Sequence, residues 1–268
     1  MEGRKVQQRM AGQPQFPVYV ISKGRAYNPM TAHHFEKAGI DYLIAVEPQE
    51  AKEYVKAVGK DHVLILPFSN LGVGSYPARN YCWEHAKAKG YKYHWLFDDN
   101  ILAFRKWING RRHNTDEVLK ALTYVERNAI RSSVSITGFE EPNFVVKPPK
   151  VPFKYNCHVY SAMLIRNDIP WRWRLKYNED VDLCLQVLHG GGTTSSCVYY
   201  MADKVSTSMK MKGGNQSELY KGNDPKKKLL KAKMLEAVWP QYAKTVIRFG
   251  RYHHHVDWKV FKKKSKVA

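Results

Sequence analysis

The chain has 268 residues, 44% of them apolar, so it can bury the core of one large α/β domain or of two small ones. Lysine and arginine outnumber aspartate and glutamate by 44 to 24, which gives a net charge of +20 and an isoelectric point near 9.7. This composition excludes a disordered tail, and it favours a polyanionic partner such as nucleic acid over an acidic membrane surface.

No segment of the sequence is suited to crossing a membrane. The longest apolar stretches, residues 42–46 and 63–68, are far too short to span a bilayer, and no apolar signal core follows the first basic residues. The four cysteines are widely spaced, which indicates neither a zinc site nor a disulfide framework. We therefore expect a cytoplasmic protein with reduced thiols and no membrane partner; the sequence carries no signal for an oligomeric state.

The first half of the chain alternates strands with helices. Residues 1–15 lack periodicity and are expected to form a flexible arm. After them we expect strands at 17–22, 42–46 and 63–66, with helices at 31–37 and 50–58 between them. This alternation predicts right-handed β-α-β units and an α/β fold whose central sheet is mostly parallel and flanked by helices.

A glycine-containing loop, residues 69–80, follows the third strand and leads into a helix expected at 81–88. Backbone amides of such a loop and helix start suit a phosphate. Arg79 and Asn80 stand at the end of the loop, where a guanidinium fork and a side-chain amide could contact a diphosphate or a base edge. An ordinary surface arginine beside a helix cap is the alternative.

The next expected strand, residues 91–97, ends in an acidic cluster. It would deliver Asp98, Asp99 and Asn100 to the carboxyl edge of the sheet, where open α/β sheets bind ligands. Oxygen ligands in this position could hold Mg²⁺ or Mn²⁺. A polar turn after a strand would look the same.

A second acidic pair lies farther along. We expect a helix at 115–130, strands at 133–138 and 159–165, a helix at 180–188 and a strand at 199–205. Glu179 and Asp180 lie at the start of the helix at 180–188. A fixed carboxylate can accept the proton of an attacking hydroxyl, so Asp180 is the candidate general base, and Glu179 could orient the acceptor. Alternatively, both residues cap the helix and complement its dipole.

Two segments have the composition of a nucleic-acid surface. Aromatic rings alternate with cations immediately before the acidic pair, a pattern that could stack an unpaired base or pack as a half-buried strand. These residues are Trp171, Arg172, Trp173 and Arg174. A basic C-terminal region includes Lys226, Lys227 and Lys228. These lysines could bind DNA phosphates, or they could form a solvated helix face.

The ordered series of motifs resembles the TET-associated glycosyltransferases, a family of the GT-A type. Its known members are mainly phage enzymes thought to add sugars to hydroxymethylated pyrimidines in DNA. The motifs are Ser22-Lys23-Gly24-Arg25-Ala26, Ala78-Arg79-Asn80, Phe97-Asp98-Asp99-Asn100, Asn178-Glu179-Asp180-Val181-Asp182-Leu183 and Gly213-Gly214-Asn215. The resemblance covers residues 16 to 260 and implies a single GT-A-like domain over 16–268.

The resemblance also implies roles for individual residues. The donor-binding residues would be Ser22, Lys23, Arg25, Arg79, Asn80, Asp98, Gly213, Gly214 and Asn215. Apart from the resemblance, Lys210 and Lys212 could stabilise the departing diphosphate from a closing lid, or they could belong to a solvated basic loop. The metal ligands would be Asp98, Asp99 and Asn100, although the family has aspartate where Asn100 stands. One of His253, His254 and His255 could add a late metal ligand, or the three could lie on a surface strand.

The sequence therefore predicts a glycosyltransferase that moves a sugar from a UDP-sugar to the hydroxyl of 5-hydroxymethylcytosine in DNA. The reaction would be inverting and assisted by Mn²⁺ or Mg²⁺, and it would occur in the host cytoplasm if a phage encodes the protein. Two alternatives stay open: a GT-A glycosyltransferase that acts on protein, glycan or RNA, and a non-catalytic DNA-binding protein that kept the fold.

Overall fold

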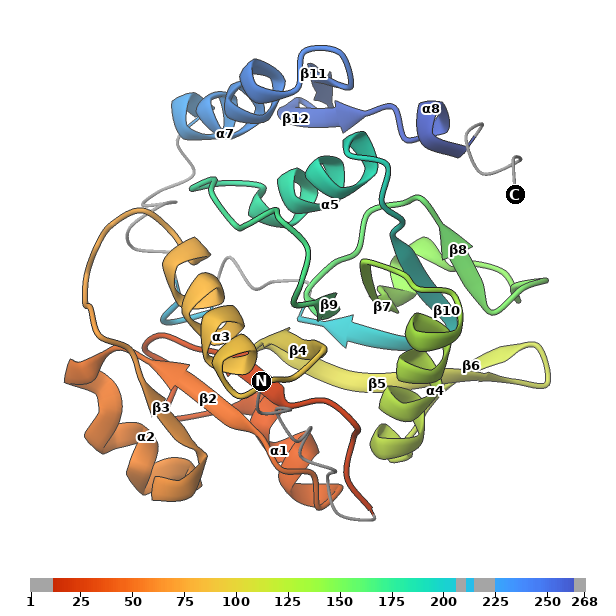
Figure 1. Cartoon of the computed structure of the whole chain (residues 1–268). Helices are drawn as coiled ribbons and strands as arrows, with labels where there is room; N and C mark the ends of the chain where they lie inside the picture. Colours follow the sequence, from red (N-terminus) through yellow and green to blue (C-terminus); the bar gives the residue numbers. More distant parts are fainter. Residues whose placement is uncertain (1–11, 206–210, 215–224, 263–268) are drawn as a thin grey trace, which may run out of the picture.

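The structure, a computed structural model, describes residues 12–205, 211–214 and 225–262 (Figure 1). The ordered chain begins before residue 16. Gln13 Nε2 donates a hydrogen bond to Gly39 O at 2.7 Å, and the amide of Gln15 donates to Glu126 Oε2 at 3.0 Å. The end of the predicted arm is therefore attached to the domain, and residues 1–11 lie outside the described part.

One large sheet runs through the molecule in the order β3-β2-β1-β4-β9-β7-β10-β5-β6, with β8 paired to β10. Its strands are β1 (Val18–Ile21), β2 (Leu43–Val46), β3 (Val63–Ile65), β4 (Tyr93–Asp98), β5 (Ile101–Ile108), β6 (Arg111–Asn114), β7 (Ile136–Glu140), β8 (Phe153–Tyr155), β9 (Ala162–Arg166) and β10 (Ser195–Lys204). Strands β1 to β4 are mutually parallel, as are β7 and β10, whereas β9, β5 and β8 run antiparallel to their neighbours.

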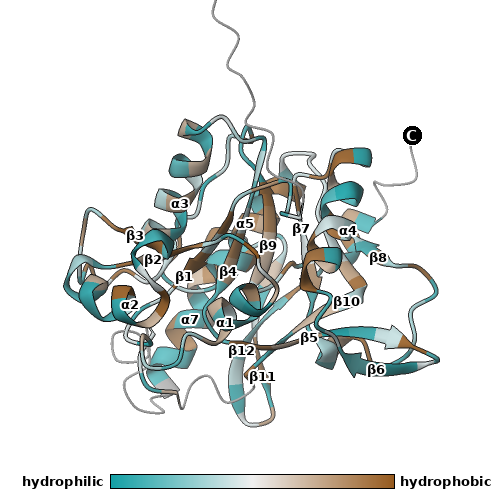
Figure 2. Cartoon of the chain, turned by 90° about the horizontal axis from the view of Figure 1, so that it is seen from below, coloured by the Kyte–Doolittle hydropathy of each residue, from teal (hydrophilic) through white to brown (hydrophobic). Residues whose placement is uncertain are grey.

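Helices cover both faces of this sheet. Their bounds are α1 (Met30–Lys37), α2 (Ala51–Val58), α3 (Tyr76–Ala88), α4 (Val118–Arg131) and α5 (Glu179–His189), with short 3-10 turns η1 (Pro48–Glu50), η2 (Lys60–His62) and η3 (Pro142–Phe144). Helices α1, α2 and α4 bury their apolar sides in one core against the sheet, and α3 and α5 do so on the opposite face. In Figure 2 the apolar strands β1, β4 and β9 lie inside this shell of more polar helices. The predicted α/β class is confirmed.

A further layer covers the outer side of α5 (Figure 1). It consists of α7 (Pro225–Val238), the two-stranded sheet of β11 (Ala243–Arg248) and β12 (Arg251–Val256), and the short α8 (Lys259–Lys262). Leu235, Trp239 and Val256 of this layer pack in one core with Val181 and Leu185 of α5. Helix α5 is thus held between the main sheet and the C-terminal layer.

Most of the expected elements are present, but several differ, and β8, α7, β11, β12 and α8 were not predicted. Helix α3 begins at Tyr76 rather than at residue 81, so Arg79 and Asn80 lie within the helix and not in the loop before it. The hairpin of β5 and β6 was not predicted, and β10 begins at Ser195 rather than at 199. Within the described ranges, no helix is both long and apolar enough to cross a bilayer.

Candidate active site

A cleft of about 430 Å³ opens at the carboxyl ends of β1 and β4. The glycine loop before α3 forms another wall, with Gly72, Gly74 and Ser75 at its surface. Among the lining residues are Ser22, Lys23, Arg25, Arg79, Asp98, Asp99, Asn100, Glu179, Lys204, Gly214 and Lys231. The fold thus brings most of the predicted donor residues, separated by up to 192 positions from Ser22 to Gly214, into one cavity.

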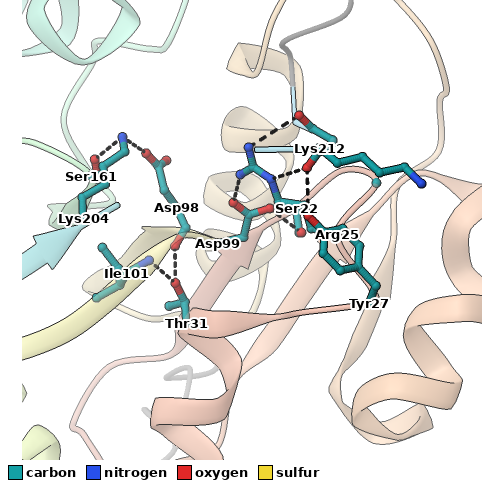
Figure 3. Close-up of polar contacts among 12 residues, drawn as sticks. Ser22, Arg25, Tyr27, Thr31, Asp98, Asp99, Ile101, Ser161, Lys204 and Lys212 are labelled. Carbon is teal, nitrogen blue, oxygen red and sulfur yellow. Dashed lines mark hydrogen bonds and ion pairs between the residues drawn. The ribbon is translucent and has the colours of Figure 1, made fainter. Parts of the chain in front are cut away.

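Asp98 is held between two cations. Arg79 donates to its Oδ1 at 2.7 Å, and Lys204 Nζ donates to its Oδ2 at 2.8 Å. Lys204 also donates to Ser161 Oγ at 2.8 Å, so its ammonium is fixed from both sides (Figure 3). Burial would raise the pKa of the Asp98 carboxyl, but the charges of Lys204 and Arg79 outweigh it and hold that pKa well below its usual range.

Asp99 is held in a similar way by the loop after β1. Arg25 forms an ion pair with its Oδ1, and Ser22 Oγ donates to its Oδ2 at 2.6 Å. Burial nevertheless raises the pKa of the Asp99 carboxyl, with the Arg25 charge opposing the shift. Thr31 fixes the backbone here, since its hydroxyl donates to Asp98 O at 2.7 Å and accepts from the Ile101 amide at 3.0 Å (Figure 3).

These contacts do not suit the divalent cation predicted from the sequence. All four carboxylate oxygens of Asp98 and Asp99 already accept hydrogen bonds, and three side-chain cations neutralise the two charges. Asn100 Oδ1 is buried and has no hydrogen-bond partner among the described residues, but it is a single neutral oxygen. No group of three or more His, Cys, Asp or Glu side chains able to hold a metal occurs in the described part of the chain. The arrangement instead presents fixed positive charge to a ligand.

The acidic pair stands at the start of α5, beside the same cleft. Asn178 adopts the left-handed conformation, with φ of 55°, immediately before the helix begins at Glu179. Glu179 Oε1 accepts from Ser75 Oγ at 2.7 Å and lies 3.5 Å from the Arg79 guanidinium. One nitrogen of Arg79 therefore contacts both Asp98 and Glu179, and it joins the aspartate cluster to the acidic pair.

Asp180 faces a different set of partners. His158 Nε2 lies 3.1 Å from Asp180 Oδ2, and the His158 ring stacks on Trp258 of the C-terminal layer with an interplanar angle of 6°. Burial would raise the pKa of Asp180, but the charge and hydrogen bond of His158 outweigh it and hold that pKa well below the usual range. Burial lowers the pKa of His254 to about 4, and Asp180 partly opposes this shift, which puts β12 near the acidic pair.

Comparison with known proteins identifies the family. A model of the TET-Associated Glycosyltransferase family matches residues 16–214, which is most of the chain. The protein belongs to this family. It is therefore a glycosyltransferase.

Several chains of solved structures match, and one of them is similar at low identity. It is a putative nucleotide-diphospho-sugar transferase from Desulfovibrio desulfuricans G20, with 13% identity and a TM-score of 0.38, over 69% of this chain and 79% of that chain. This likeness is too slight to support an argument about function. No curated protein matches the chain.

Gly213 and Gly214 pack against the motif at 22–26. The Gly214 amide donates to Lys23 O at 2.6 Å, and Arg25 Nε donates to Lys212 O at 3.3 Å. A side chain at Gly213 would meet Gly24 O at 2.4 Å, so the close approach of the two loops requires glycine there. Lys210 and Asn215, the other residues predicted for this loop, lie outside the described residues.

Other predicted residues have structural partners. Asn80 bonds to both backbone groups of Trp173, at 2.8 and 3.2 Å, and it does not line the cleft. Trp173 is 1% exposed, so its ring is not available to stack on a base. Arg172 lies over the Trp83 ring and pairs with Glu84.

Arg174 is also engaged, since it makes two hydrogen bonds of 3.0 Å to Asp182. Lys226 is exposed on α7, and Lys227 and Lys228 beside it are half-buried. In β12, His253 and His255 are exposed and His254 is half-buried, which agrees with the surface-strand alternative.

Sequence reasoning missed several residues of the site, chiefly Lys204, Ser161, Ser75 and His158. Lys204, Ser75 and His158 lie 106, 104 and 22 positions from their acidic partners, and Ser161 lies 43 positions from Lys204. None of the four belongs to a recognisable local motif. Lys204 is the last residue of β10, and pairing of that strand with β5 brings it to the turn after β4. Only the assembled sheet reveals it.

Proposed function

We propose that this glycosyltransferase moves a sugar from a UDP-sugar to the hydroxymethyl group of a modified pyrimidine in DNA, with inversion at the anomeric carbon. The observation that carries the proposal is the contact of Arg79 with Asp98 on one side and Glu179 on the other. Asp98 and Glu179 both line the cleft, which supports a single site with the expected donor residues on one side and Glu179, the neighbour of the expected base, on the other.

On the donor side, the charge of the cleft supports a nucleotide diphosphate. Arg79 and Lys204 are fixed in place by Asp98, and Arg25 by Asp99, so little side-chain freedom is lost when they bind phosphate. Burial opposes the charge of Lys204, yet Asp98 raises the pKa of its ammonium above the usual value, and Lys204 stays charged. The metal assistance predicted from the sequence is not part of this proposal.

On the acceptor side, Asp180 would act as the general base. The hydroxyl oxygen of the acceptor forms a bond to the anomeric carbon, the bond from that carbon to the diphosphate oxygen breaks, and Asp180 receives the hydroxyl proton. The attacking oxygen becomes strongly acidic as its new bond forms, so a carboxylate with a low pKa is a sufficient base. UDP leaves with the added negative charge, which Arg79 and Lys204 stabilise.

DNA as acceptor is supported by the charge of the whole chain. The net charge is +20, and residues 204–268 contribute 17 lysines and arginines against 4 acidic residues. Such an excess favours a polyanion over a neutral glycan. Position 5 of cytosine projects into the major groove, so a hydroxymethyl group there is accessible on a duplex.

Mass spectrometry of modified DNA tests this proposal. DNA containing 5-hydroxymethylcytosine is incubated with a panel of UDP-sugars, in parallel with unmodified DNA, RNA and protein acceptors, and is digested to nucleosides. We expect a hexose-sized mass gain on hydroxymethylcytosine and none on unmodified cytosine. Transfer to RNA or protein alone, or no transfer from any donor, contradicts the acceptor assignment.

A further inference from the structure

The structure contains two β-hairpins that close with the same two-residue turn. In β5–β6, Ile108 pairs with Arg111 around Asn109 and Gly110, and in β11–β12, Arg248 pairs with Arg251 around Phe249 and Gly250. The turn residues have positive φ in both hairpins, at 48° and 75° in the first and at 51° and 68° in the second. This is the pattern of a type I′ turn.

The two turns differ in how well their first residue suits that backbone. Asn-Gly is the preferred sequence of a type I′ turn, because asparagine tolerates the left-handed region. A bulky aromatic residue is an outlier there, and Phe249 is therefore unfavourable for the turn that it forms. It gains nothing from packing either, since it is 96% exposed, more than any other large apolar side chain in the described part.

The end of this hairpin combines apolar and cationic side chains. Ile247 and Tyr252, a cross-strand pair next to the turn, are 68% and 37% exposed. Arg248 and Arg251 flank Phe249, and Arg248 also donates to His255 Nδ1 at 3.2 Å. Residues 243–256 contain no aspartate or glutamate. An exposed apolar tip between cations, in a hairpin whose own sequence has no acidic residue, suits a polyanion that also offers flat apolar surface.

The hairpin starts beside the active site and points away from it. Its base packs on α7 and α5 through Ala243 and Val256, and His254 lies near Asp180. Figure 2 shows the hairpin projecting beyond the body of the molecule. Five residues of strand separate His254 from Phe249, a span of about 17 Å, or roughly five base-pair steps along a duplex.

We propose that the β11–β12 hairpin is a DNA-contacting element, with Phe249 against the bases and Arg248 and Arg251 on the phosphates. The major groove admits a two-stranded ribbon, and the C5 substituent of a pyrimidine lies in that groove. This inference rests on the proposed DNA acceptor and adds a surface outside residues 16–214, where the family match lies. The hairpin fixes the register of the DNA while a base several steps away receives the sugar.

Phe249→Asn tests this element, because it gives the turn its preferred Asn-Gly sequence. We expect its melting temperature to equal or exceed that of the unmodified protein, while its affinity for a hydroxymethylcytosine duplex falls roughly tenfold, as expected for the loss of one aromatic contact with a base. Arg251→Gln should lower the slope of log K against log salt by about one. Ile65→Asn, at another exposed apolar position, serves as the control and should leave DNA affinity unchanged.

Three measurements separate the outcomes. Fluorescence anisotropy with a labelled duplex measures DNA affinity, sedimentation with phosphatidylserine vesicles measures membrane binding, and the sugar-transfer assay measures activity. Unchanged DNA affinity in Phe249→Asn overturns the inference, and so does a loss of affinity that accompanies a lower melting temperature. Vesicle binding that depends on Phe249, with DNA binding intact, also overturns it in favour of a membrane surface. If Phe249→Asn binds DNA normally and sugar transfer persists, the proposed function stands and only the hairpin inference is rejected. If neither the unmodified protein nor Phe249→Asn binds DNA, the hairpin inference and the proposed DNA acceptor are both rejected.

Discussion

At the scale of single residues, Asp98 shows what the sequence could predict about the site and what it could not. Its place at the end of a buried strand was predicted correctly, and the residue lines the cleft. The partners that define its chemistry, Arg79 and Lys204, come from 19 positions before it and 106 positions after it. A local motif can reveal a carboxylate at a strand end, but it cannot reveal which cations the fold brings to it.

The role of Asp180 is a prediction at this scale. Asp180→Asn keeps the size of the side chain and removes the group that accepts the proton, so we expect turnover to fall by about 10²–10⁴-fold. Affinity for UDP should stay nearly unchanged, because Asp180 contacts His158 and does not line the cleft. Steady-state transfer rates and UDP titrations measure the two effects separately.

Asp168→Asn is the matched control for that variant. Asp168 is exposed and pairs with Arg166, away from the cleft, so this exchange should leave turnover unchanged. Full activity in Asp180→Asn would remove Asp180 from the role of base.

At the scale of elements, apolar runs predicted the strands of the first half well, because β1, β2 and β4 are buried on both faces. The β5–β6 hairpin was missed although Asn109-Gly110 is a strong hairpin signal. Helix α3 starts earlier than expected, at Tyr76. It can include Pro77 because proline is tolerated in the first turn of a helix. Helix α7 and its hairpin could not be placed, since their apolar residues pack on α5 and not on the sheet.

The glycine loop before α3 offers a prediction at the scale of elements. Gly74, with φ of 93°, lies so close to the segment before α5 that an added Cβ would meet Lys176 O at 2.7 Å. Gly74→Ala should therefore push the loop away from α5 and weaken UDP binding. We expect a destabilisation of about 1–3 kcal/mol from overpacking, in addition to the cost of the left-handed backbone, measured by urea unfolding.

Gly72→Ala isolates the backbone cost. Gly72 also has positive φ, at 67°, but no atom in the described part of the chain lies within 4 Å of an added Cβ. This variant should lose only about 1–2 kcal/mol from its left-handed backbone and should bind UDP more tightly than Gly74→Ala. Equal stability and equal UDP affinity of the two variants would show that the contact with Lys176 has no role.

At the scale of the whole molecule, the site combines residues of the family-matched region with residues of the C-terminal layer. The family match ends at residue 214, but Lys231 of α7 lines the cleft and Trp258 stacks on His158. Sequence motifs predicted several residues of the family-matched region, because these residues follow strands in a regular α/β order. They did not predict those of the C-terminal layer, whose contribution depends on how that layer packs over α5.

The central claim is that fixed side-chain cations, anchored by Asp98 and Asp99, hold the diphosphate of the sugar donor. Calorimetric titration with UDP tests it most directly, in EDTA and in Mn²⁺. We predict similar affinity for UDP in both buffers. Lys204→Ala should lower this affinity tenfold or more, as expected for the loss of a charge-assisted hydrogen bond. Lys154→Ala should not change it, because Lys154 pairs with Glu140 outside the cleft. UDP binding that appears only with Mn²⁺ and is unchanged in Lys204→Ala would contradict the claim.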